Sequence, residues 1–354
     1  EGGKTRNLGI PRVMDRMVQQ AIAQVLSEIY EPEFSEQSYG FRPGRGAHDA
    51  LRQCLANANE GYDWVVDMDL ERFFDTVNHS KLIQVLSEKV KDGRVVSLIH
   101  RFLRAGVVVN GMYQKTEEGC PQGGNLSPIL ANILLNECDH ELELRGHRFV
   151  RYADDMVISC ASRKGAERTL ESTARYLENV LKLKVNREKT CIARIGGIKF
   201  LGYGFYFDTK AKEWNFRLHE KSEAKLKAKI KEITQRSNGW SVAYRQAKLS
   251  QLVRGWVAYF KLARCKRTLE RIDQWLRRRI RMLHWKMWKR VRTRYKRLMK
   301  LGVAKQKAYE WANSRIGYWR VAKSWILTTT LDNRRLYTMG WRWFSGLYAR
   351  EYVN

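Results

Sequence analysis

The sequence has no long apolar run and no secretory signal. Apolar residues make up 44% of its 354 positions. Charged residues interrupt them well before the ~20 consecutive apolar residues that a membrane-spanning helix needs, and the N-terminal residues do not form a signal peptide. These absences argue against a membrane or secreted protein, whereas the length and the apolar content suit a folded chain of two or three domains.

Cysteine is scarce and widely spaced. No two of the six cysteines form a Cys-x-x-Cys pair, so the sequence predicts neither a zinc site nor a disulfide framework. We therefore expect reduced thiols and a cytoplasmic location. The six residues are Cys54, Cys120, Cys138, Cys160, Cys191 and Cys265.

Acidic residues are few relative to basic ones. The chain has 37 Asp and Glu against 66 Lys and Arg, a formal net charge of +29. Such an excess predicts a polyanionic partner, because neutralising phosphates releases their bound counterions. A membrane surface is the competing polyanion, but the chain has no membrane-directed segment, so we expect nucleic acid and no membrane.

Two of the acids, Asp154 and Asp155, lie at the tip of a predicted β-hairpin. Phe149–Tyr152 and Met156–Cys160 have the composition of short strands, and residues 153–155 form the turn between them. Adjacent carboxylates repel each other unless a cation lies between them, and Mg²⁺ prefers such oxygen ligands. By itself, however, an Asp-Asp pair more often marks an ordinary acidic turn.

A third carboxylate strengthens the prediction of a metal site. Trp64–Leu70 is strand-like, and its alternation places Asp67 and Asp69 on one face and Val66, Met68 and Leu70 on the other. An acidic strand end that faces the acidic hairpin tip would hold two cations. Such a pair can clamp the attacking and leaving oxygens of an in-line phosphoryl displacement.

These residues resemble the palm of a reverse transcriptase. The Tyr-Ala-Asp-Asp motif at 152–155 and the run Asp69–Asp75 carry the resemblance. It implies an α/β fold of the right-hand polymerase type, with fingers and an antiparallel palm sheet, followed by an all-α thumb. It also implies that Asp69, Asp154 and Asp155 are catalytic. With Leu70 they would bind two Mg²⁺ ions, for which Mn²⁺ is an alternative.

Further motifs extend the resemblance to the reverse transcriptases encoded by group II introns. Leu8–Arg16 is similar to their first shared block, Ser38–Gly46 to the second and Pro121–Pro128 to the fourth. We expect the additional N-terminal fingers segment of the family to be missing from this chain.

The resemblance assigns nucleotide contacts to these blocks. It implies that Arg42 faces the incoming triphosphate and that Gln122 lies beside the nucleotide. One of Phe73 and Phe74 would exclude a ribose 2′-hydroxyl sterically. The sequence does not say which, because both rings cannot face the nucleotide.

The resemblance also assigns contacts with the primer and template. Asn186–Thr190 is similar to the sixth block of the family and Phe200–Phe205 to the seventh, which grips the primer. The residues implied are Tyr152, Lys189, Leu201 and Gly202.

Periodicity predicts helices around the palm motifs. In the first of them, the predicted apolar face consists of Val18, Ile22, Val25, Leu26 and Ile29. In the fourth, Ser127 and Pro128 suit an N-cap and a first turn. The predicted helices are Val13–Tyr30, Ala47–Ala58, Asn78–Val90, Ser127–Leu144 and Lys164–Leu183.

After Leu218 the pattern changes to helices alone. We expect them over Lys221–Gln235, Val242–Leu262 and Leu269–Met299. From Arg264 to Lys300 there are 16 basic and two acidic residues, a net charge of +14. A solvated helix face would carry both signs, so this stretch predicts phosphate contacts. Its tryptophans, Trp275, Trp285 and Trp288, fit a protein core better than base stacking.

The basic helices resemble the thumb, or maturase X domain, of group II intron proteins, of which Gly255–Phe260 is typical. Ala304–Asn354 is similar to the short, DNA-binding-like C-terminal extension of the family. No nuclease signature follows, as in the group IIC branch. We expect domains at 1–218, 219–303 and 304–354. The RNA-binding residues implied are Arg277, Arg278, Arg281, Lys286, Lys289 and Arg290.

The implied function is that of an RNA-directed DNA polymerase encoded by a mobile group II intron, which also binds the intron RNA to assist splicing and retrohoming. Its partners would be intron RNA, an RNA template, a DNA primer or target DNA, and deoxynucleoside triphosphates. Two alternatives are a domesticated relative in defence, repair or CRISPR spacer acquisition, and a splicing cofactor that does not polymerise. The intact Asp69, Asp154 and Asp155 argue against the second.

Overall fold

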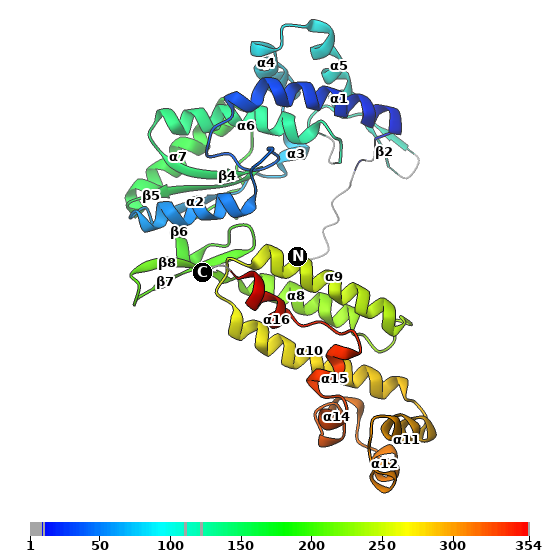
Figure 1. Ribbon diagram of the computed structural model, residues 1–354. Helices are drawn as coiled ribbons and strands as arrows, with labels where there is room; N and C mark the ends of the chain where they lie inside the picture. Colours follow the sequence, from blue (N-terminus) through cyan, green and yellow to red (C-terminus); the bar gives the residue numbers. More distant parts are fainter. Residues whose placement is uncertain (1–8, 10, 110–111, 121–122, 353–354) are drawn as a thin grey trace. The chain divides into compact units, whose positions relative to one another are not determined.

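The computed structural model describes residues 9, 11–109, 112–120 and 123–352 and divides the chain into two compact units. The first runs to Asn215 and the second begins at Phe216. Figure 1 shows strands layered with helices in the first unit and helices after the last strand in the second. No helix in the described ranges is long and apolar enough to cross a membrane. The predicted order, an α/β region followed by helices, is confirmed.

A four-stranded antiparallel sheet forms the centre of the first unit. Its strands are β1 (Trp64–Met68), β4 (Arg148–Tyr152), β5 (Asp155–Cys160) and β6 (Cys191–Arg194). Their order is β4-β5-β1-β6, so β1 is hydrogen-bonded on both sides. This is the antiparallel palm sheet that the resemblance implied.

Helices cover both faces of this sheet (Figure 1). α6 (Ser127–Leu144) and α7 (Arg163–Asn179) pack on one face, and α2 (Ala47–Asn59) packs on the other. Val66 and Met68 of β1 point towards α6 and α7 and belong to the main hydrophobic core. Asp67, between them, points to the opposite face, which confirms the predicted alternation.

α6 has the predicted bounds, although its first turn differs in detail. Ser127 is the first helical residue, and Leu126 occupies the N-cap position. Pro128 suits the first turn because an N–H at that position would have no partner within the helix. Most of the helix is buried, including Leu130, Leu134 and Leu135, so it forms the centre of the core between α1, α4 and α7.

The remaining elements before α8 (Glu220–Ile233) belong to the first unit, except that β8 continues past its last residue, Asn215. Asn78 caps α4 and Asp92 caps α5, each by accepting hydrogen bonds from backbone N–H groups of the first turn. The elements are α1 (Val13–Tyr30), α3 (Phe73–Thr76), α4 (His79–Lys89), α5 (Gly93–Arg104), the paired strands β2 (Val107–Val109) and β3 (Met112–Gln114), the paired strands β7 (Tyr203–Asp208) and β8 (Glu213–Leu218), and the 3₁₀ helices Glu31–Glu33 and Ile195–Gly197.

The buried face of α1 is only partly the one predicted. Leu26 is buried and Ile22 packs against the core, as predicted. Val25, Val18 and Ile29 are 58%, 39% and 37% exposed, so the prediction that these three lie on the core face is wrong. A glutamine belongs to the buried face because its side-chain oxygen accepts a hydrogen bond from the Asn125 N–H at 3.2 Å. The buried residues are Gln19, Ala23, Leu26 and Tyr30.

α7 ends before the predicted Leu183. The helix stops at Asn179, and Lys182 then adopts a left-handed φ of 58°, which a continuing α-helix does not allow. Leu181 and Leu183 are nevertheless buried. The apolar pattern thus continues past the end of the helix, which explains the overlong prediction.

The second unit contains nine helices within the described residues. The prediction of one helix over Leu269–Met299 is wrong, because the chain leaves the helical conformation at Trp288, where ψ is 54°. Trp285 and Trp288 are buried there, as predicted. The helices are α8 (Glu220–Ile233), α9 (Val242–Phe260), α10 (Lys266–Met287), α11 (Val291–Lys300), α12 (Lys305–Ala312), α13 (Tyr318–Val321), α14 (Trp325–Thr330), α15 (Asn333–Thr338) and α16 (Phe344–Glu351).

The C-terminal helix α16 packs against α9 and α10. The buried carboxylate of Asp273 in α10 accepts hydrogen bonds from the backbone N–H groups of Phe344 and Ser345 at 2.9 and 2.8 Å. The Tyr348 hydroxyl donates to the carbonyl of Ala263 at 2.6 Å. Residues on both sides of 303 therefore belong to one compact unit, and the proposed domain boundary there stays a prediction.

Candidate active site

The three aspartates predicted to be catalytic come together at one edge of the palm sheet. Asp69 follows the last residue of β1, and Asp154 lies in the two-residue loop between β4 and β5. Because β1 pairs in antiparallel register with β5, the end of β1 lies beside the hairpin tip that also carries Asp155. Ala153 has a φ of 57°, and positive values of this kind are what two-residue hairpin loops require.

Two carboxylates at this sheet edge, those of Asp155 and Asp67, have raised pKa values. The pKa of Asp155 is raised to about 6, first by desolvation and then by repulsion from Asp154 and Asp69. The pKa of Asp67 is raised to about 6 by desolvation and then by repulsion from Asp155 and Asp69. The sequence placed Asp67 on the same face as Asp69 but gave it no role, and the structure adds it to the coupled acids. Asp155 keeps exposed surface, so a cation can reach its carboxylate.

The main chain of Asp69 is held on both sides by the segment Asn186–Thr190. The Asp69 N–H donates to the Thr190 hydroxyl at 3.2 Å, and the Asp69 carbonyl accepts from the Asn186 N–H at 2.8 Å. The Lys189 ammonium lies 3.2 Å from the Asp69 carboxylate. The sequence reasoning missed these anchors, although the resemblance of this segment to a shared block was a signal for them.

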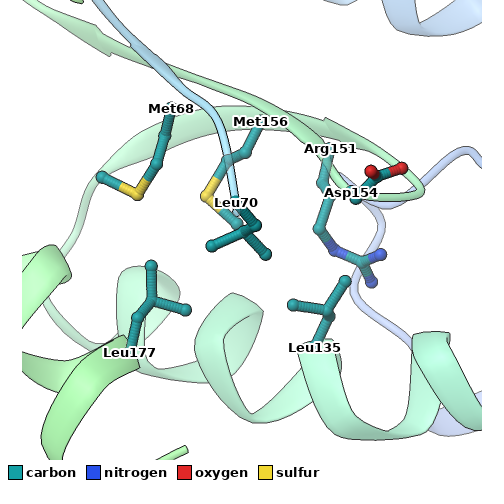
Figure 2. Close-up of a pocket in the computed structure, with 7 residues that line it drawn as sticks. All are labelled: Met68, Leu70, Leu135, Arg151, Asp154, Met156 and Leu177. Carbon is teal, nitrogen blue, oxygen red and sulfur yellow. The ribbon is translucent and has the colours of Figure 1, made fainter. Parts of the chain in front are cut away.

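A small apolar pocket lies beneath the hairpin (Figure 2). Figure 2 shows Arg151 and Asp154 on one side of it, and Met68 and Leu177 on the other. The side chain of Leu70 also lines this pocket, so the metal contact implied for that residue would come from its main chain. The remaining lining residues are Leu135 and Met156.

Arg42 does not offer its guanidinium to the outside in this structure. Its side chain is 2% exposed, and it pairs with Glu31 at 2.8 Å. Its Nη1 donates to the carbonyls of Ser35 and Ser38, while Nε and Nη2 donate to Glu31. All five N–H groups thus have protein acceptors. The predicted contact with a triphosphate has no support here, because the guanidinium holds the glycine-rich turn together.

The structure distinguishes the two phenylalanines that the sequence could not. Phe73 is 2% exposed and belongs to the core, whereas Phe74 is only partly buried. The main chain of Phe74 also holds the following loop, because its carbonyl accepts from the Cys120 N–H at 2.6 Å. Gln122, the other predicted nucleotide contact, lies outside the described residues.

Three of the four predicted primer and template contacts lie on the β4–β5 hairpin and on a tight turn of the first unit, whereas the fourth, Lys189, lies beside Asp69. Tyr152 pairs with Asp155 across the tip of β4 and β5, so its side chain shares a sheet face with that carboxylate. Leu201 and Gly202 form a tight turn with φ values of 48° and 86°. Phe200 and Tyr203 close this turn with reciprocal backbone hydrogen bonds. The roles of these residues in primer binding stay predictions.

The sequence of residues 1–205 matches the family described as reverse transcriptase (RNA-dependent DNA polymerase). The chain belongs to the reverse transcriptase family. Residues 224–302 match the group II intron, maturase-specific domain, which confirms the resemblance to group II intron-encoded reverse transcriptases that the motifs carried.

Curated relatives of this reverse transcriptase include bacterial proteins. It is 35% identical to protein YkfC of Escherichia coli K12 over 240 residues, which covers 57% of this chain and 63% of the relative. It is 32% identical over 265 residues to the group II intron-encoded protein LtrA of Lactococcus lactis subsp. cremoris, covering 56% of this chain and 44% of LtrA. The chain therefore spans less than two thirds of either relative.

Among solved structures, a telomerase from Candida albicans, in complex with a fragment of telomeric RNA, is similar at 13% identity with a TM-score of 0.47. That similarity covers 96% of this chain and 57% of the telomerase chain.

The predicted RNA-binding residues of the maturase domain divide into two groups. Arg277, Arg278 and Arg281 face the C-terminal segment of their own unit. The Arg278 guanidinium lies 3.8 Å from the centre of the Trp319 ring, and that of Arg281 donates to the Leu331 carbonyl at 2.8 Å. Arg277 lies 5.4 Å from the Trp343 ring centre, and Lys286 lies 5.2 Å from that of Tyr318. Of the predicted six, only Lys289 and Arg290 are exposed, and the other four are half-buried.

The donor chemistry of the coupled aspartates fits a divalent cation. As a reverse transcriptase, the chain belongs to a nucleotidyl-transfer family that generally uses divalent metal ions. The Asp155 carboxylate, whose pKa is raised by desolvation and then by repulsion from Asp154 and Asp69, would be stabilised by a hard cation between these groups. Within the described ranges, no three His, Cys, Asp or Glu side chains already form a metal-binding cluster. Mg²⁺ is usually bound through one or two carboxylates together with substrate phosphates, and carboxylate oxygens of this kind fit it.

Replacing Asp67 by Asn should stabilise the metal-free protein at neutral pH. The folded pKa of Asp67, about 6, lies above its ordinary value of 3.8, so the folded state binds more protons between these values. Ionised Asp67 therefore destabilises the folded state increasingly as pH rises from about 4 to about 6, and this destabilisation persists at higher pH. At pH 7.5 we expect the free energy of unfolding of Asp67→Asn to be about 1 kcal/mol larger than that of wild type, after allowance for partial exposure. Near pH 3.5 the two values should be equal.

Urea unfolding in EDTA at the two pH values measures this difference. Asp63→Asn is the matched control, because Asp63 pairs with Arg194 at 2.8 Å near the start of the same strand and its loss removes an attraction instead of a repulsion. Excess Mg²⁺ should stabilise wild type more than Asp67→Asn. A less stable Asp67→Asn protein at pH 7.5 would contradict the repulsion between the acids.

Proposed function

We propose that this chain is an RNA-directed DNA polymerase encoded by a group II intron, and that it also binds the intron RNA to assist splicing and retrohoming. The observation that carries the proposal is the meeting of Asp69 with Asp154 and Asp155, from a strand end and a hairpin tip far apart in sequence. The maturase-specific domain supports the second role. The substrates would be an RNA template, a DNA primer or target DNA, and deoxynucleoside triphosphates.

The three aspartates would hold two Mg²⁺ ions, with the Leu70 main chain as a further ligand and Mn²⁺ as an alternative metal. Such ions lower the pKa of an attacking hydroxyl and stabilise a leaving pyrophosphate. The fold contributes rigid placement, because the main chain of Asp69 is bonded on both sides. Lys189 pairs with Asp69, and we propose that its ammonium turns to a primer or template phosphate when a metal replaces it.

The nucleotide would lie beside Phe74. We propose that its ring excludes the ribose 2′-hydroxyl, since Phe73 is buried in the core. Gln122 stays a proposed nucleotide contact. For Arg42 we propose an indirect role, in which its buried guanidinium holds the glycine-rich turn of 38–46 in place. The primer would contact Tyr152, Leu201 and Gly202.

We also propose a bacterial cytoplasmic location. All six cysteines are unpaired, which suits a reducing compartment.

Asp154→Asn should abolish primer extension on an RNA template. The change removes one proposed metal ligand but leaves every basic side chain in place, so affinity for a primer–template duplex should stay within a few-fold of wild type. Extension is measured with a radiolabelled primer, and affinity by fluorescence anisotropy of the same duplex. Extension at the wild-type rate would exclude Asp154 as a metal ligand.

Phe74→Val should raise the incorporation of ribonucleotides relative to deoxyribonucleotides, because a smaller side chain leaves room for the 2′-hydroxyl. Phe73→Ala is the matched comparison, since it removes a neighbouring ring from the core. It should cost roughly 3–5 kcal/mol of unfolding free energy without changing sugar selection. Single-nucleotide incorporation with each sugar measures the ratio. Unchanged selection in Phe74→Val would place the steric gate elsewhere.

The exposed basic residues around the start of α11 should carry RNA affinity. Replacing Lys289, Arg290, Arg292 and Lys296, all exposed, by Gln removes four potential phosphate contacts. The slope of log affinity for intron RNA against log salt should flatten by about three units if all four contact phosphate. The comparison set is Arg277→Gln/Arg278→Gln/Arg281→Gln, which should mainly lower the unfolding temperature because these side chains hold the second unit together. If instead the three-arginine variant flattened the salt slope and the exposed-residue variant did not, Arg277, Arg278 and Arg281 would be the RNA contacts.

A further inference from the structure

We propose that Arg151 is a positioning residue for the catalytic hairpin. Its buried guanidinium, fixed by α6, holds the main chain at Ala153 and so sets the direction of Asp154 and Asp155. This inference rests on the proposed polymerase function, because that function requires the two carboxylates to bind a metal ion. The sequence reasoning treated Arg151 as an ordinary residue of the strand.

Arg151 is anchored in α6 by a fully buried ion pair. Both side chains of the pair with Asp139 are 0% exposed. Nε of Arg151 donates to the two carboxylate oxygens at 2.8 and 2.9 Å, and Nη2 donates to one of them at 2.5 Å. A charge pair this deep is costly to desolvate and rarely adds stability over a well-packed apolar pair. Its geometry therefore points to a use besides holding the fold together.

The remaining nitrogen of the guanidinium contacts the hairpin tip. Nη1 of Arg151 donates to the Ala153 carbonyl at 3.1 Å and to the Asn132 side-chain oxygen at 3.0 Å. Asn132 lies seven residues before Asp139, on the same face of α6. Ala153 is in the left-handed region, which is unfavourable for a residue with a Cβ. The hydrogen bond to its carbonyl holds this conformation directly before Asp154.

A second segment, residues 37–40, packs against the same turn from outside the hairpin. The Asn132 amide donates to the Gly40 carbonyl at 2.8 Å. A methyl group on Gly40 would lie 2.3 Å from the Ala153 nitrogen, so only glycine allows this approach. The main chain of Arg151 is also bonded to this segment, since its N–H donates to the Gln37 carbonyl and its carbonyl accepts from the Tyr39 N–H. The planar guanidinium reaches Asp139, Asn132 and Ala153 at once, which a lysine cannot do.

The test separates positioning from stability with a double variant. Arg151→Met alone leaves the Asp139 carboxylate buried and unpaired, and should unfold readily. Arg151→Met/Asp139→Leu replaces the pair by apolar side chains of similar size and should recover much of the stability to urea. It still has no donor for the Ala153 carbonyl. We expect its rate of single-nucleotide addition to stay about 10- to 100-fold below wild type, as for the loss of groups that orient metal ligands.

Metal dependence is the measurement that distinguishes the two roles, because a purely structural role of Arg151 would not change it. In the double variant the Mg²⁺ concentration for half-maximal addition should rise, while affinity for the primer–template duplex stays unchanged. Arg245→Met is the matched control, because Arg245 is 4% exposed and its guanidinium donates to the carbonyls of Ile233 and Gln235 in the second unit. It should lose stability without a shift in metal dependence. A stable double variant with wild-type addition and metal dependence would overturn the proposal.

A separate measurement tests the role of Arg151 even if the protein is not a polymerase. If wild type adds no nucleotide, the polymerase proposal fails, and Mn²⁺ binding followed by electron paramagnetic resonance still tests Arg151. Weaker Mn²⁺ binding by the double variant than by wild type would support positioning. Equal binding by the two proteins would overturn it.

Discussion

Repulsion between carboxylates at one edge of the palm sheet is the constraint that the first unit has to satisfy. Desolvation and mutual repulsion raise the pKa values of Asp67 and Asp155 to about 6, so the fold holds these groups together against a cost. It does so through main-chain anchors. Thr190 and Asn186 bond the backbone of Asp69, and Arg151 bonds the turn before Asp154. The anchors come from distant parts of the sequence, so the site forms only when the whole unit folds.

The second unit uses its basic residues in two different ways. Several guanidinium groups bond carbonyls at the ends of helices, where four carbonyls lack partners within the helix. Arg245 bonds the Ile233 carbonyl at the end of α8, Arg281 the Leu331 carbonyl after α14, and Arg294 the Trp288 carbonyl after α10. Other basic side chains, such as Lys289 and Arg290, are exposed. Some of the basic residues therefore stabilise the ends of helices, and others remain exposed and available to bind phosphate.

Elements with strong local signals were predictable from the sequence. α6 has the predicted bounds, and the hairpin of β4 and β5 lies where alternation and the Asp-Asp turn placed it. Local signals failed where packing against distant residues decided the outcome. α1 buries Gln19 and exposes Val25 because of its neighbours in the fold. The end of α10 before Trp288 also could not be predicted, because the helical periodicity of the sequence continues past it.

The candidate site shows the same division between sequence and tertiary structure. Residue type and spacing by themselves predicted Asp69 at a strand end and Asp154 and Asp155 at a hairpin tip, because strand alternation and hairpin geometry are local properties of the backbone. That these acids meet was implied by the family resemblance, and the antiparallel pairing of β1 with β5 brings them together. Only the tertiary structure decided which of two adjacent phenylalanines is buried, that Arg42 turns inward, and that Arg151 pairs with a helix residue. These depend on which side chains from other segments fill the space around them, and burial and pairing of this kind have no local pattern in the sequence.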